Sequence, residues 1–336
     1  MSNNTNKAVV TGGCGFIGSH MVELLINKNF EVIVIDNLST GRLSNLEKLK
    51  GHKKIKIIEA NIIDFQDSSL FEDISYVFHF AGKGDIVPSI DNPKEYFETN
   101  ANGTLNILEL SKNSQCFERF VYAASSSCYG LASTPTSENH PINNEHPYAL
   151  SKYIGETIVA HWSKIYDLPF TSIRIFNAYG PRVRTTGVYG AVFGVFFKQK
   201  LEGYPLTVVG DGNQSRDFLF VEDVCEAFLM SALSKNSINE IYNLGFGKPK
   251  TINELVKILE SEKISLPDRP GEPRITHADI SKISSDLGWK PKISFEQGVN
   301  RMLNEIENWQ DAPLWTPDKI EDVTKNWFKF LKNKNA

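Results

Sequence analysis

A glycine-rich turn between an apolar segment and an amphipathic segment constrains the fold of this 336-residue chain more than any other feature. Residues 8–11 are short, apolar and partly β-branched, which predicts a buried strand. The glycine-rich run at 12–18 follows directly, and apolar residues then recur at helical spacing to residue 26. A strand, a glycine turn and a helix in this order predict the start of a βαβ unit that binds phosphate groups.

The glycines of this turn have the spacing of dinucleotide-binding sites. Gly13, Gly15 and Gly18 match G-x-G-x-x-G, which permits a tight turn, close approach to a pyrophosphate and close packing of helix on strand. The free amide groups and the positive dipole end of the helix favour the same anion. On its own, a glycine triplet also fits a plain glycine-rich turn. The cofactor contacts that we expect in this turn are Gly12, Gly15, Phe16, Ile17 and Gly18.

The end of the next expected strand, residues 31–36, indicates which dinucleotide binds. Asp36 lies 21 residues after Gly15, where a carboxylate can accept hydrogen bonds from the ribose hydroxyl groups of the adenosine. Asp36 would repel a 2′-phosphate, and the next residues, Asn37 and Leu38, provide no arginine to bind one. We therefore expect NAD as the cofactor, not NADP, with Asp36 and Asn37 among its contacts.

Short apolar runs and longer amphipathic stretches continue to alternate through the first half of the chain. Further strands are expected at 55–59 and 76–79, and the β-branched run at 32–35 suits a strand buried on both faces. This rhythm predicts a doubly wound α/β fold, with a parallel sheet between two layers of helices. A helix over 222–233 is also expected, and a strand over 240–244 that returns to the large sheet.

The pattern becomes irregular after residue 182, where glycines and prolines are frequent. We expect a smaller, loop-rich α/β lobe there that binds the substrate. The NAD-binding domain would comprise residues 1–176 and about 217–246. The substrate-binding lobe would comprise residues 177–216 and 247–336.

Composition excludes several classes of function. Acidic and basic residues nearly balance, with a net charge of −4, so no surface for nucleic acid or an anionic membrane is indicated. No apolar run reaches the roughly 20 residues that span a bilayer. The four cysteines lack metal-ligand spacing, so no metal site is expected, and no secretory signal precedes the first strand. We expect a reduced, cytoplasmic protein with a small-molecule partner.

A serine-rich segment and a tyrosine–lysine pair supply the candidate catalytic groups. Three serines at 125–127 follow an apolar run at 121–124. Tyr148 and Lys152 are four residues apart in an amphipathic stretch, which places phenol and ammonium on one helix face. A neighbouring ammonium and an oxidised nicotinamide ring favour the phenolate, so the tyrosine can act as a base near neutral pH. Alone, this spacing also fits an ordinary, partly buried helix face.

Together, these motifs resemble those of the extended short-chain dehydrogenase/reductase family, in particular its nucleotide-sugar epimerases and dehydratases. The chain is most similar to UDP-glucose and UDP-N-acetylglucosamine 4-epimerases, and the resemblance covers nearly its whole length. The motifs that carry the resemblance are Thr11-Gly12-x-x-Gly15-x-x-Gly18, Asp36-Asn37, His79-Phe80-Ala81-Gly82, Asn100-x-x-Gly103-Thr104, Ser125 to Gly130, Tyr148-x-x-x-Lys152, Arg174-x-Phe176-Asn177-x-Tyr179-Gly180-Pro181, Arg216-Asp217 and Arg269-Pro270-Gly271-Glu272.

The resemblance implies catalytic roles for three residues. Tyr148 corresponds to the base that takes the proton of the sugar hydroxyl, and Lys152 to the residue that holds the nicotinamide ribose. Ser125 corresponds to the hydroxyl group that bridges tyrosine and substrate. Further cofactor contacts are implied at Asn61, where relatives usually have aspartate, and at Ala81 and Asn100.

The resemblance also implies contacts to the substrate. Asn177 corresponds to a diphosphate contact, and Arg216 and Arg269 to the cations that neutralise the diphosphate, a task that suits a guanidinium group. Either arginine alone would also fit a surface ion pair. The segment 189–193 resembles the nucleotide-clamping stretch of UDP-sugar relatives. The other substrate contacts that we expect are Asp85, Ser127, Val192 and Thr276.

The residues at 125–127 indicate the reaction. Dehydratases of this family carry Thr-Asp-Glu at these positions, because expelling water requires an acid and a base in addition to the tyrosine. Decarboxylating relatives keep the glutamate. Ser126 and Ser127 cannot perform this proton chemistry. The sequence therefore favours a 4-epimerase that oxidises a nucleoside-diphosphate hexose to a transient 4-ketone and reduces it again. A 4,6-dehydratase, a 4-dehydrogenase, a uronate 4-epimerase and a non-catalytic NAD-binding module are the alternatives.

Several positions bear on the sugar. A carboxylate at Asp85 could accept hydroxyl or amine hydrogens and would disfavour a uronic acid. Thr276 stands where relatives that admit an N-acetyl group carry a small residue, which argues for a roomy 2-position. Arg182, Arg184 and Thr185 could contact phosphate or an acidic sugar, or could lie in a solvated loop with ion pairs. UDP-glucose, UDP-galactose and UDP-N-acetylhexosamines are the candidate substrates.

The resemblance finally implies a homodimer. Its interface would use the helix at 148–162 and a helix near 104–111. The apolar positions of both segments would equally suit the core of a single chain.

Overall fold

Seven strands form the central sheet of the protein, for which the computed structural model describes residues 6–183 and 192–331. The strands are β1 (Lys7–Thr11), β2 (Glu31–Asp36), β3 (Ile55–Glu59), β4 (Tyr76–His79), β5 (Arg119–Ser125), β6 (Phe170–Ile175) and β11 (Glu240–Leu244). All neighbouring pairs are parallel. Their order, β11-β6-β5-β4-β1-β2-β3, extends outward from β1 in both directions, so the predicted doubly wound fold is confirmed.

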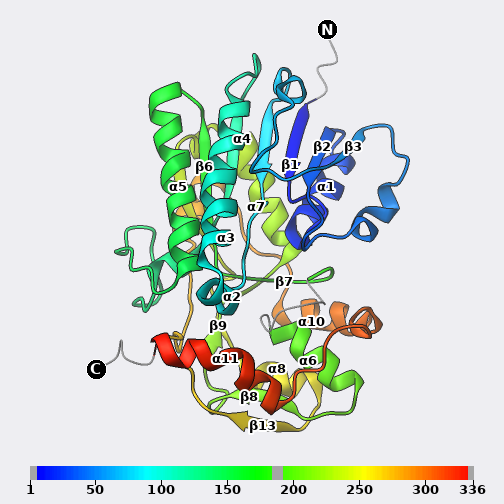
Figure 1. The fold of residues 1–336 in the computed structure, drawn as a ribbon, viewed down its shortest axis with the longest axis vertical. Coiled ribbons are helices and arrows are strands. Elements are labelled where there is room, and N and C mark those ends of the chain that lie inside the picture. Colours follow the sequence, from blue (N-terminus) through cyan, green and yellow to red (C-terminus); the bar gives the residue numbers. More distant parts are fainter. Residues whose placement is uncertain (1–5, 184–191, 332–336) are drawn as a thin grey trace.

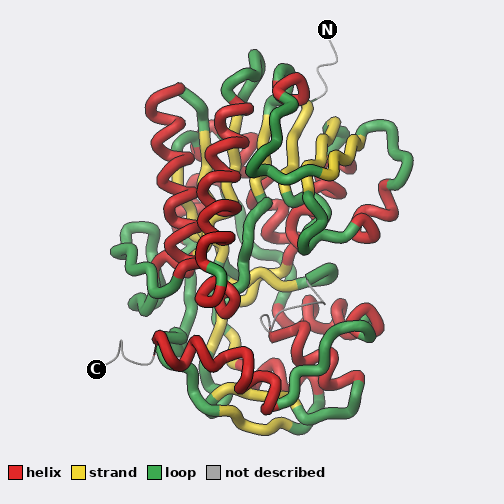
Figure 2. Tube along the Cα trace, viewed as in Figure 1, coloured by secondary structure: helices red, strands yellow, loops and turns green. Residues whose placement is uncertain are grey.

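Helices cover both faces of this sheet because apolar side chains alternate along each strand (Figures 1 and 2). Val10 and Val34 belong to the apolar cluster that includes residues of α1 and α7. Their neighbours Val9 and Ile33 belong to the cluster on the other face, with residues of α4 and α5. These helices are α1 (Phe16–Asn27), α4 (Thr104–Ser111), α5 (Pro147–Tyr166) and α7 (Val221–Leu233), and the short α2 (Ile86–Asp91) and α3 (Pro93–Phe97) precede α4.

The second half of the chain contributes most of a smaller group of elements below the sheet in Figure 1. These lower elements are α6 (Val192–Leu201), β8 (Leu206–Val209), α8 (Ile252–Leu259), β13 (Lys263–Leu266), α10 (Phe295–Leu303) and α11 (Pro317–Leu331). β8 and β13 pair in parallel, and β9 (Ser215–Arg216) pairs with β12 (Lys250–Thr251). A third pair, β7 (Asn177–Tyr179) with β10 (Phe218–Phe220), lies where the chain passes between the sheet and the lower elements.

Two lower helices begin at capping boxes. Thr251 caps α8 and is in turn capped by the Glu254 side chain, and Ser294 and Gln297 do the same for α10. Each box satisfies two backbone amides that the first helical turn leaves unpaired. The region with an irregular sequence pattern therefore contains more regular helices than its glycines and prolines suggested.

The strands expected at 31–36, 55–59, 76–79 and 240–244 are present, and β11 returns to the large sheet as expected, where it pairs with β6. The expected division into lobes has one notable exception. Residues 281–287 form α9 (Ser281–Leu287), where Lys282 Nζ donates to the Ile241 carbonyl oxygen of β11 at 2.8 Å. This helix therefore lies beside the large sheet, although it falls within 247–336.

None of the described helices is both long and apolar enough to cross a membrane. Within residues 6–183 and 192–331, no cluster of three or more His, Cys, Asp or Glu side chains is arranged to hold a metal ion. Cys14, Cys128 and Cys225 are buried free thiols, and Cys116 is an exposed one.

Candidate functional site

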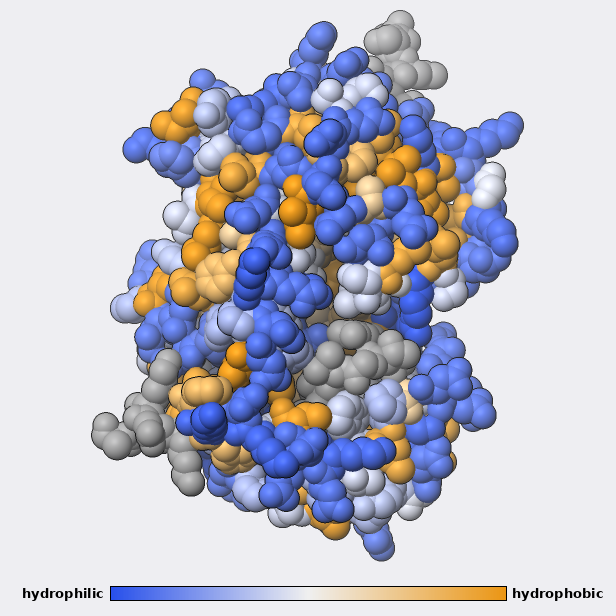
Figure 3. All heavy atoms as spheres, in the orientation of Figure 1, coloured by the Kyte–Doolittle hydropathy of each residue, from blue (hydrophilic) through white to orange (hydrophobic). Residues whose placement is uncertain are grey.

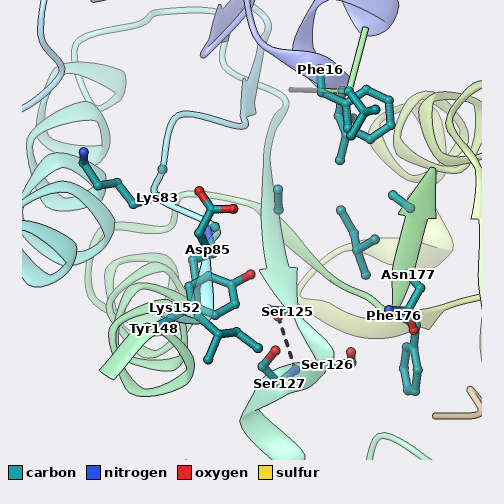
Figure 4. Close-up of a pocket in the computed structure, with 18 of the residues that line it drawn as sticks. Phe16, Lys83, Asp85, Ser125, Ser126, Ser127, Tyr148, Lys152, Phe176 and Asn177 are labelled. Atoms are coloured by element: carbon teal, nitrogen blue, oxygen red, sulfur yellow. Dashed lines mark hydrogen bonds between the residues drawn. The ribbon is translucent and has the colours of Figure 1, made fainter. Parts of the chain in front are cut away.

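A cavity of about 720 Å³ opens at the carboxyl ends of the central strands. Its lining comes from the glycine turn after β1, the ends of β2, β4 and β5, the start of α5, and lower segments that include β7, β9 and residues 269–276. Ligands of open α/β sheets bind at this edge. Figure 3 shows the surface hollowed between the upper and lower parts, and Figure 4 shows side chains around the pocket.

The glycine turn fits a pyrophosphate because it leaves no room for side chains. Gly12 has a φ of +67°, and a Cβ atom there would lie 2.7 Å from the backbone nitrogen of Ala81. A Cβ atom on Gly18 would collide with the Gly12 carbonyl oxygen. Phe16 and Ile17 line the cavity at the start of α1, whose first-turn amides have no partner within the helix. This turn can therefore hold the diphosphate of a dinucleotide.

The Asp36 carboxylate is fixed at the end of β2. Its oxygens accept hydrogen bonds from the backbone amides of Cys14 at 2.9 Å and Leu38 at 2.8 Å. Burial raises the pKa of Asp36, and the two amides lower it. Each carboxylate oxygen keeps a lone pair for a further donor, as ribose binding requires.

Asn100 differs from the other expected cofactor contacts, because it lies behind the cavity wall. Its side chain accepts from the Lys83 amide at 2.7 Å and donates to the Lys83 carbonyl and to Ser151. It therefore holds the main chain of Lys83, which lines the cavity. The expected cofactor residues that line the cavity are Gly12, Gly15, Phe16, Ile17, Gly18, Asp36, Asn37, Asn61, Ala81, Tyr148 and Lys152.

The three candidate catalytic residues lie together at one wall (Figure 4). Ser125 ends β5, and its hydroxyl accepts a hydrogen bond from the Ser127 amide at 3.2 Å. Tyr148 lies in the first turn of α5, where its phenol interacts with the Ser125 side chain. Lys152 follows one turn later and places its ammonium 4.4 Å from the centre of the Tyr122 ring.

The electrostatics of this wall differ from the sequence-based expectation of a lowered tyrosine pKa. Burial raises the pKa of Tyr148, Asp85 and Cys128 raise it further, and the interaction with Ser125 lowers it. Burial also lowers the pKa of Lys152 to about 7, against the effect of Glu156. Desolvation therefore disfavours both charged forms in the protein alone.

Replacing Asp85 by asparagine is expected to move the acid limb of the pH–rate profile to lower pH. Asp85 raises the pKa of Tyr148, so removing its charge lets the phenolate form in more acidic solution. The measurement is kcat/KM against pH for the wild type and Asp85→Asn, with the exposed Asp64→Asn as control. An unchanged acid limb would show that Asp85 does not influence the base.

Arg216 and Arg269 share one carboxylate at the lower wall of the cavity. Glu272 Oε1 lies 2.6 Å from Arg216 Nη2, and Glu272 Oε2 lies 3.7 Å from Arg269 Nη1. The two arginine side chains are only 12% and 13% exposed. Two guanidinium groups held together in this way can neutralise a diphosphate. Glu272 belongs to the motif Arg269-Pro270-Gly271-Glu272 noted in the sequence, but its role in holding both arginines was not predicted.

The other expected substrate contacts also line the cavity. Thr276 donates a hydrogen bond to Asn177 Oδ1 at 2.7 Å and accepts one from the Asp217 amide at 3.1 Å. The residue expected at the sugar 2-position and the residue expected at the diphosphate therefore form one unit. Val192 lies at the start of α6. The lining residues among these expected contacts are Asp85, Ser127, Asn177, Val192, Arg216, Arg269 and Thr276.

Arg182 forms an ion pair outside the cavity. Its guanidinium pairs with Glu23 of α1 at 2.7 Å, and it is absent from the cavity lining, so the ion-pair alternative holds for this residue. Arg184, Thr185 and residues 189–191 lie outside the described residues. Trp327 of α11 lines the cavity as well, and no motif in the sequence indicated it.

Comparisons with known proteins show which proteins the chain resembles. The family model described as GDP-mannose 4,6 dehydratase matches residues 9–302. A relative from Methanocaldococcus jannaschii, provisionally named UDP-glucose 4-epimerase, is 38% identical over 89% of this chain and 98% of its own length.

Solved structures are similar over most of the chain. The UDP-N-acetylglucosamine 4-epimerase of Methanobrevibacter ruminantium, in complex with UDP-N-acetylmuramic acid, is 32% identical with a TM-score of 0.83, covering 90% of this chain and 99% of its own. The UDP-glucuronic acid 4-epimerase of Bacillus cereus, in complex with UDP-glucuronic acid and NAD, is 32% identical with a TM-score of 0.84 and the same coverage.

Proposed function

Because the chain belongs to the extended short-chain dehydrogenase/reductase family of nucleotide-sugar epimerases and dehydratases, we propose that it is an NAD-dependent 4-epimerase of a nucleoside-diphosphate hexose. The candidate substrates are UDP-glucose, UDP-galactose and UDP-N-acetylhexosamines. The observation that carries the proposal is the meeting of Ser125, Tyr148 and Lys152 at the cavity wall beside the glycine turn.

In the proposed reaction, Tyr148 removes the proton of the 4-hydroxyl group while the Ser125 hydroxyl holds the same oxygen by a hydrogen bond. Bound NAD would take the hydride from C4, return it later and add positive charge beside the phenol. Lys152 would hold the nicotinamide ribose, and Asp36 would hold the adenosine ribose. Tyr148 returns the proton to O4 when the C4–H bond forms again on the opposite face of the ketone.

Between the two half-reactions the keto sugar must rotate, so that the opposite face of C4 receives the hydride. The sugar therefore cannot be held as firmly as the diphosphate. Asn177, Arg216 and Arg269 anchor the diphosphate at the lower wall in this proposal. The hexose is then free to rotate within the cavity. In this proposal the ketone stays within the cavity between the sheet and the lower elements because the diphosphate remains anchored.

Serines at 126 and 127 favour epimerisation over loss of water. Both line the cavity next to Ser125, and neither hydroxyl group is an acid or base strong enough to drive elimination from the sugar. A 4,6-dehydratase would need such groups near C5 and C6. A one-way 4-dehydrogenase would release the ketone and leave the cofactor reduced as NADH.

Among the possible substrates of a 4-epimerase, Asp85 favours neutral hexoses over uronic acids. Its side chain lies on the same side of the cavity as Tyr148, so a sugar carboxylate near it would be repelled (Figure 4). Hydroxyl or amine groups could instead donate hydrogen bonds to it. A UDP-uronate 4-epimerase is therefore the less favoured alternative.

Purified protein incubated with UDP-, dTDP-, GDP- and CDP-sugars tests the proposed reaction. Epimerisation leaves the mass of the sugar nucleotide unchanged and produces a second isomer on chromatography. Loss of 18 mass units would indicate a dehydratase, and accumulation of NADH would indicate a dehydrogenase. UDP-glucose, UDP-N-acetylglucosamine and UDP-glucuronate in the same panel compare the three sugar types. Failure to convert any of them would reject the proposal.

We also propose the domain division given above, with residues 1–176 and about 217–246 binding NAD, and cytoplasmic localisation. A homodimer would form through α4 and α5, and on α5 the apolar residues Leu150, Ile165 and Tyr166 are 40%, 54% and 47% exposed. A light-scattering mass equal to one chain would contradict the dimer.

A further inference from the structure

The C-terminal helix α11 connects the two groups of elements that enclose the cavity. Ile320, in its first half, belongs to the same apolar cluster as Phe197 of α6. In its second half, Trp327 and Leu331 form a separate buried cluster with Val87 of α2. Figure 1 shows α11, in red, running across the molecule beneath α2. The helix therefore packs on the lower elements at one end and on the upper elements at the other.

Trp327 is the residue at which this helix reaches the cavity. Its side chain is 4% exposed and lines the cavity wall. The indole nitrogen donates a hydrogen bond of 2.8 Å to the carbonyl oxygen of Pro270. Pro270 directly follows Arg269, so this bond fixes the main chain beside one of the two guanidinium groups.

A second bond holds the same part of α11 on α2. The Asn326 side chain donates to the Asp91 carboxylate at 2.8 Å, at the end of α2. α2 begins directly after Asp85, the residue that lies on the tyrosine side of the cavity. Adjacent residues of α11 therefore connect the segment at 269–272 with the helix next to the catalytic wall.

α11 lies beyond residues 9–302, the part of the chain that the family model matches. α11 reaches the cavity wall through Trp327, whose hydrogen-bond partner Pro270 adjoins Arg269, the residue proposed to contact the diphosphate. An effect on substrate binding, separate from the chemical step, follows from that position.

We propose that Trp327 is a positioning residue for the diphosphate of the substrate. Its indole holds residues 269–272 against α2, so that Arg269 stays in the cavity wall facing the diphosphate. This inference rests on the proposed role of Arg269. Trp327 acts through Arg269, and its ring closes the wall between Val87 and Pro270.

The test compares nucleotide binding by Trp327→Ala, Trp327→Phe and the wild type. UDP, dTDP, GDP and CDP are titrated into the NAD-loaded wild type by calorimetry. The nucleotide that binds most tightly is then used for all variants. Trp327→Ala is expected to weaken its binding about tenfold. Trp327→Phe keeps the ring and loses one hydrogen bond, so about a threefold to fivefold loss is expected. NAD content should equal that of the wild type in both variants.

Two controls separate positioning from a general loss of structure. Phe330→Ala changes a side chain on the same helix that is 56% exposed, and nucleotide affinity should stay within about twofold. In a double-mutant cycle, Trp327→Ala should weaken nucleotide binding little further once Arg269 has been replaced by alanine. In turnover assays, Trp327→Ala should raise KM about tenfold and change kcat less than about threefold.

The outcomes distinguish this inference from the proposed function. Unchanged affinity in folded Trp327→Ala, or equal losses in the presence and absence of Arg269, would overturn the role of Trp327 alone. A wild type that binds a nucleoside diphosphate but epimerises no sugar would reject the proposed function. The double-mutant cycle of nucleotide binding would still test the role of Trp327. A wild type that binds none of the four would reject both.

Discussion

Tyr148→Phe is expected to lower kcat by about 10²–10⁴-fold, because the phenyl ring fills the same space but cannot take the proton of the sugar hydroxyl. The loss corresponds to about 3–5 kcal/mol of activation free energy. The ring centroid lies 5.9 Å from that of His146 in a stacked arrangement, and phenylalanine can keep this packing. The measurement is the steady-state rate on the sugar nucleotide identified in the panel, together with the NAD content of the purified variant.

Tyr166→Phe is the matched control. Tyr166 is the last residue of the same helix, opposite the end that carries Tyr148, and it does not line the cavity. The control should retain wild-type kcat. If Tyr148→Phe kept more than a tenth of the activity with bound NAD, another group would have to be the base.

Glu156→Gln is expected to lower the free energy of unfolding by about 3–5 kcal/mol, since it leaves the buried guanidinium of Arg174 without its counter-charge. The two side chains are 4% and 5% exposed and are joined at 2.5 Å and 3.0 Å. Their interaction raises the pKa of Arg174 despite its burial. The measurement is urea-induced unfolding, with the midpoint compared at an unchanged slope.

The pair also connects the catalytic helix with the sheet. Glu156 lies one turn after Lys152 on α5, and Arg174 belongs to β6 and donates to the Tyr129 hydroxyl at 2.7 Å. The double variant Glu156→Gln with Arg174→Met should lose less free energy of unfolding than Glu156→Gln alone, because no unpaired charge remains. Glu47→Gln, which breaks an exposed ion pair with Lys50, should cost less than about 1 kcal/mol. Equal effects of Glu156→Gln and Glu47→Gln would contradict this account.

Most of the sheet could be predicted from sequence because its strands carry their own apolar signals, although β6 (Phe170–Ile175) was not identified. The β-branched run at 32–35 is buried on both faces in the structure, and the strand expected at 240–244 joins the same sheet. The lower elements were harder to predict, since their helices are short and separated by glycines and prolines. Thr251 with Glu254 and Ser294 with Gln297 were capping signals that sequence reasoning did not use.

The site could be predicted where function depends on a local motif. Tyr148 and Lys152 share a helix face, so their spacing was enough to expect them together. The wall position of Trp327 depends on a long-range contact between α11 and α2, which no local pattern reveals. The raised pKa of Tyr148 was also beyond the sequence, because desolvation depends on everything packed around the phenol.

The parallel pair of β7 and β10 has a mechanical consequence for substrate entry. β7 follows β6 of the central sheet almost directly, β10 leads directly into α7, and Asn177 is paired with Phe218 within this two-stranded ribbon. A hinge motion that widened the cleft would have to bend both strands together, because their hydrogen bonds join them. Such bending would displace Asn177, so admission of a sugar nucleotide and the hold on its diphosphate would change in the same movement.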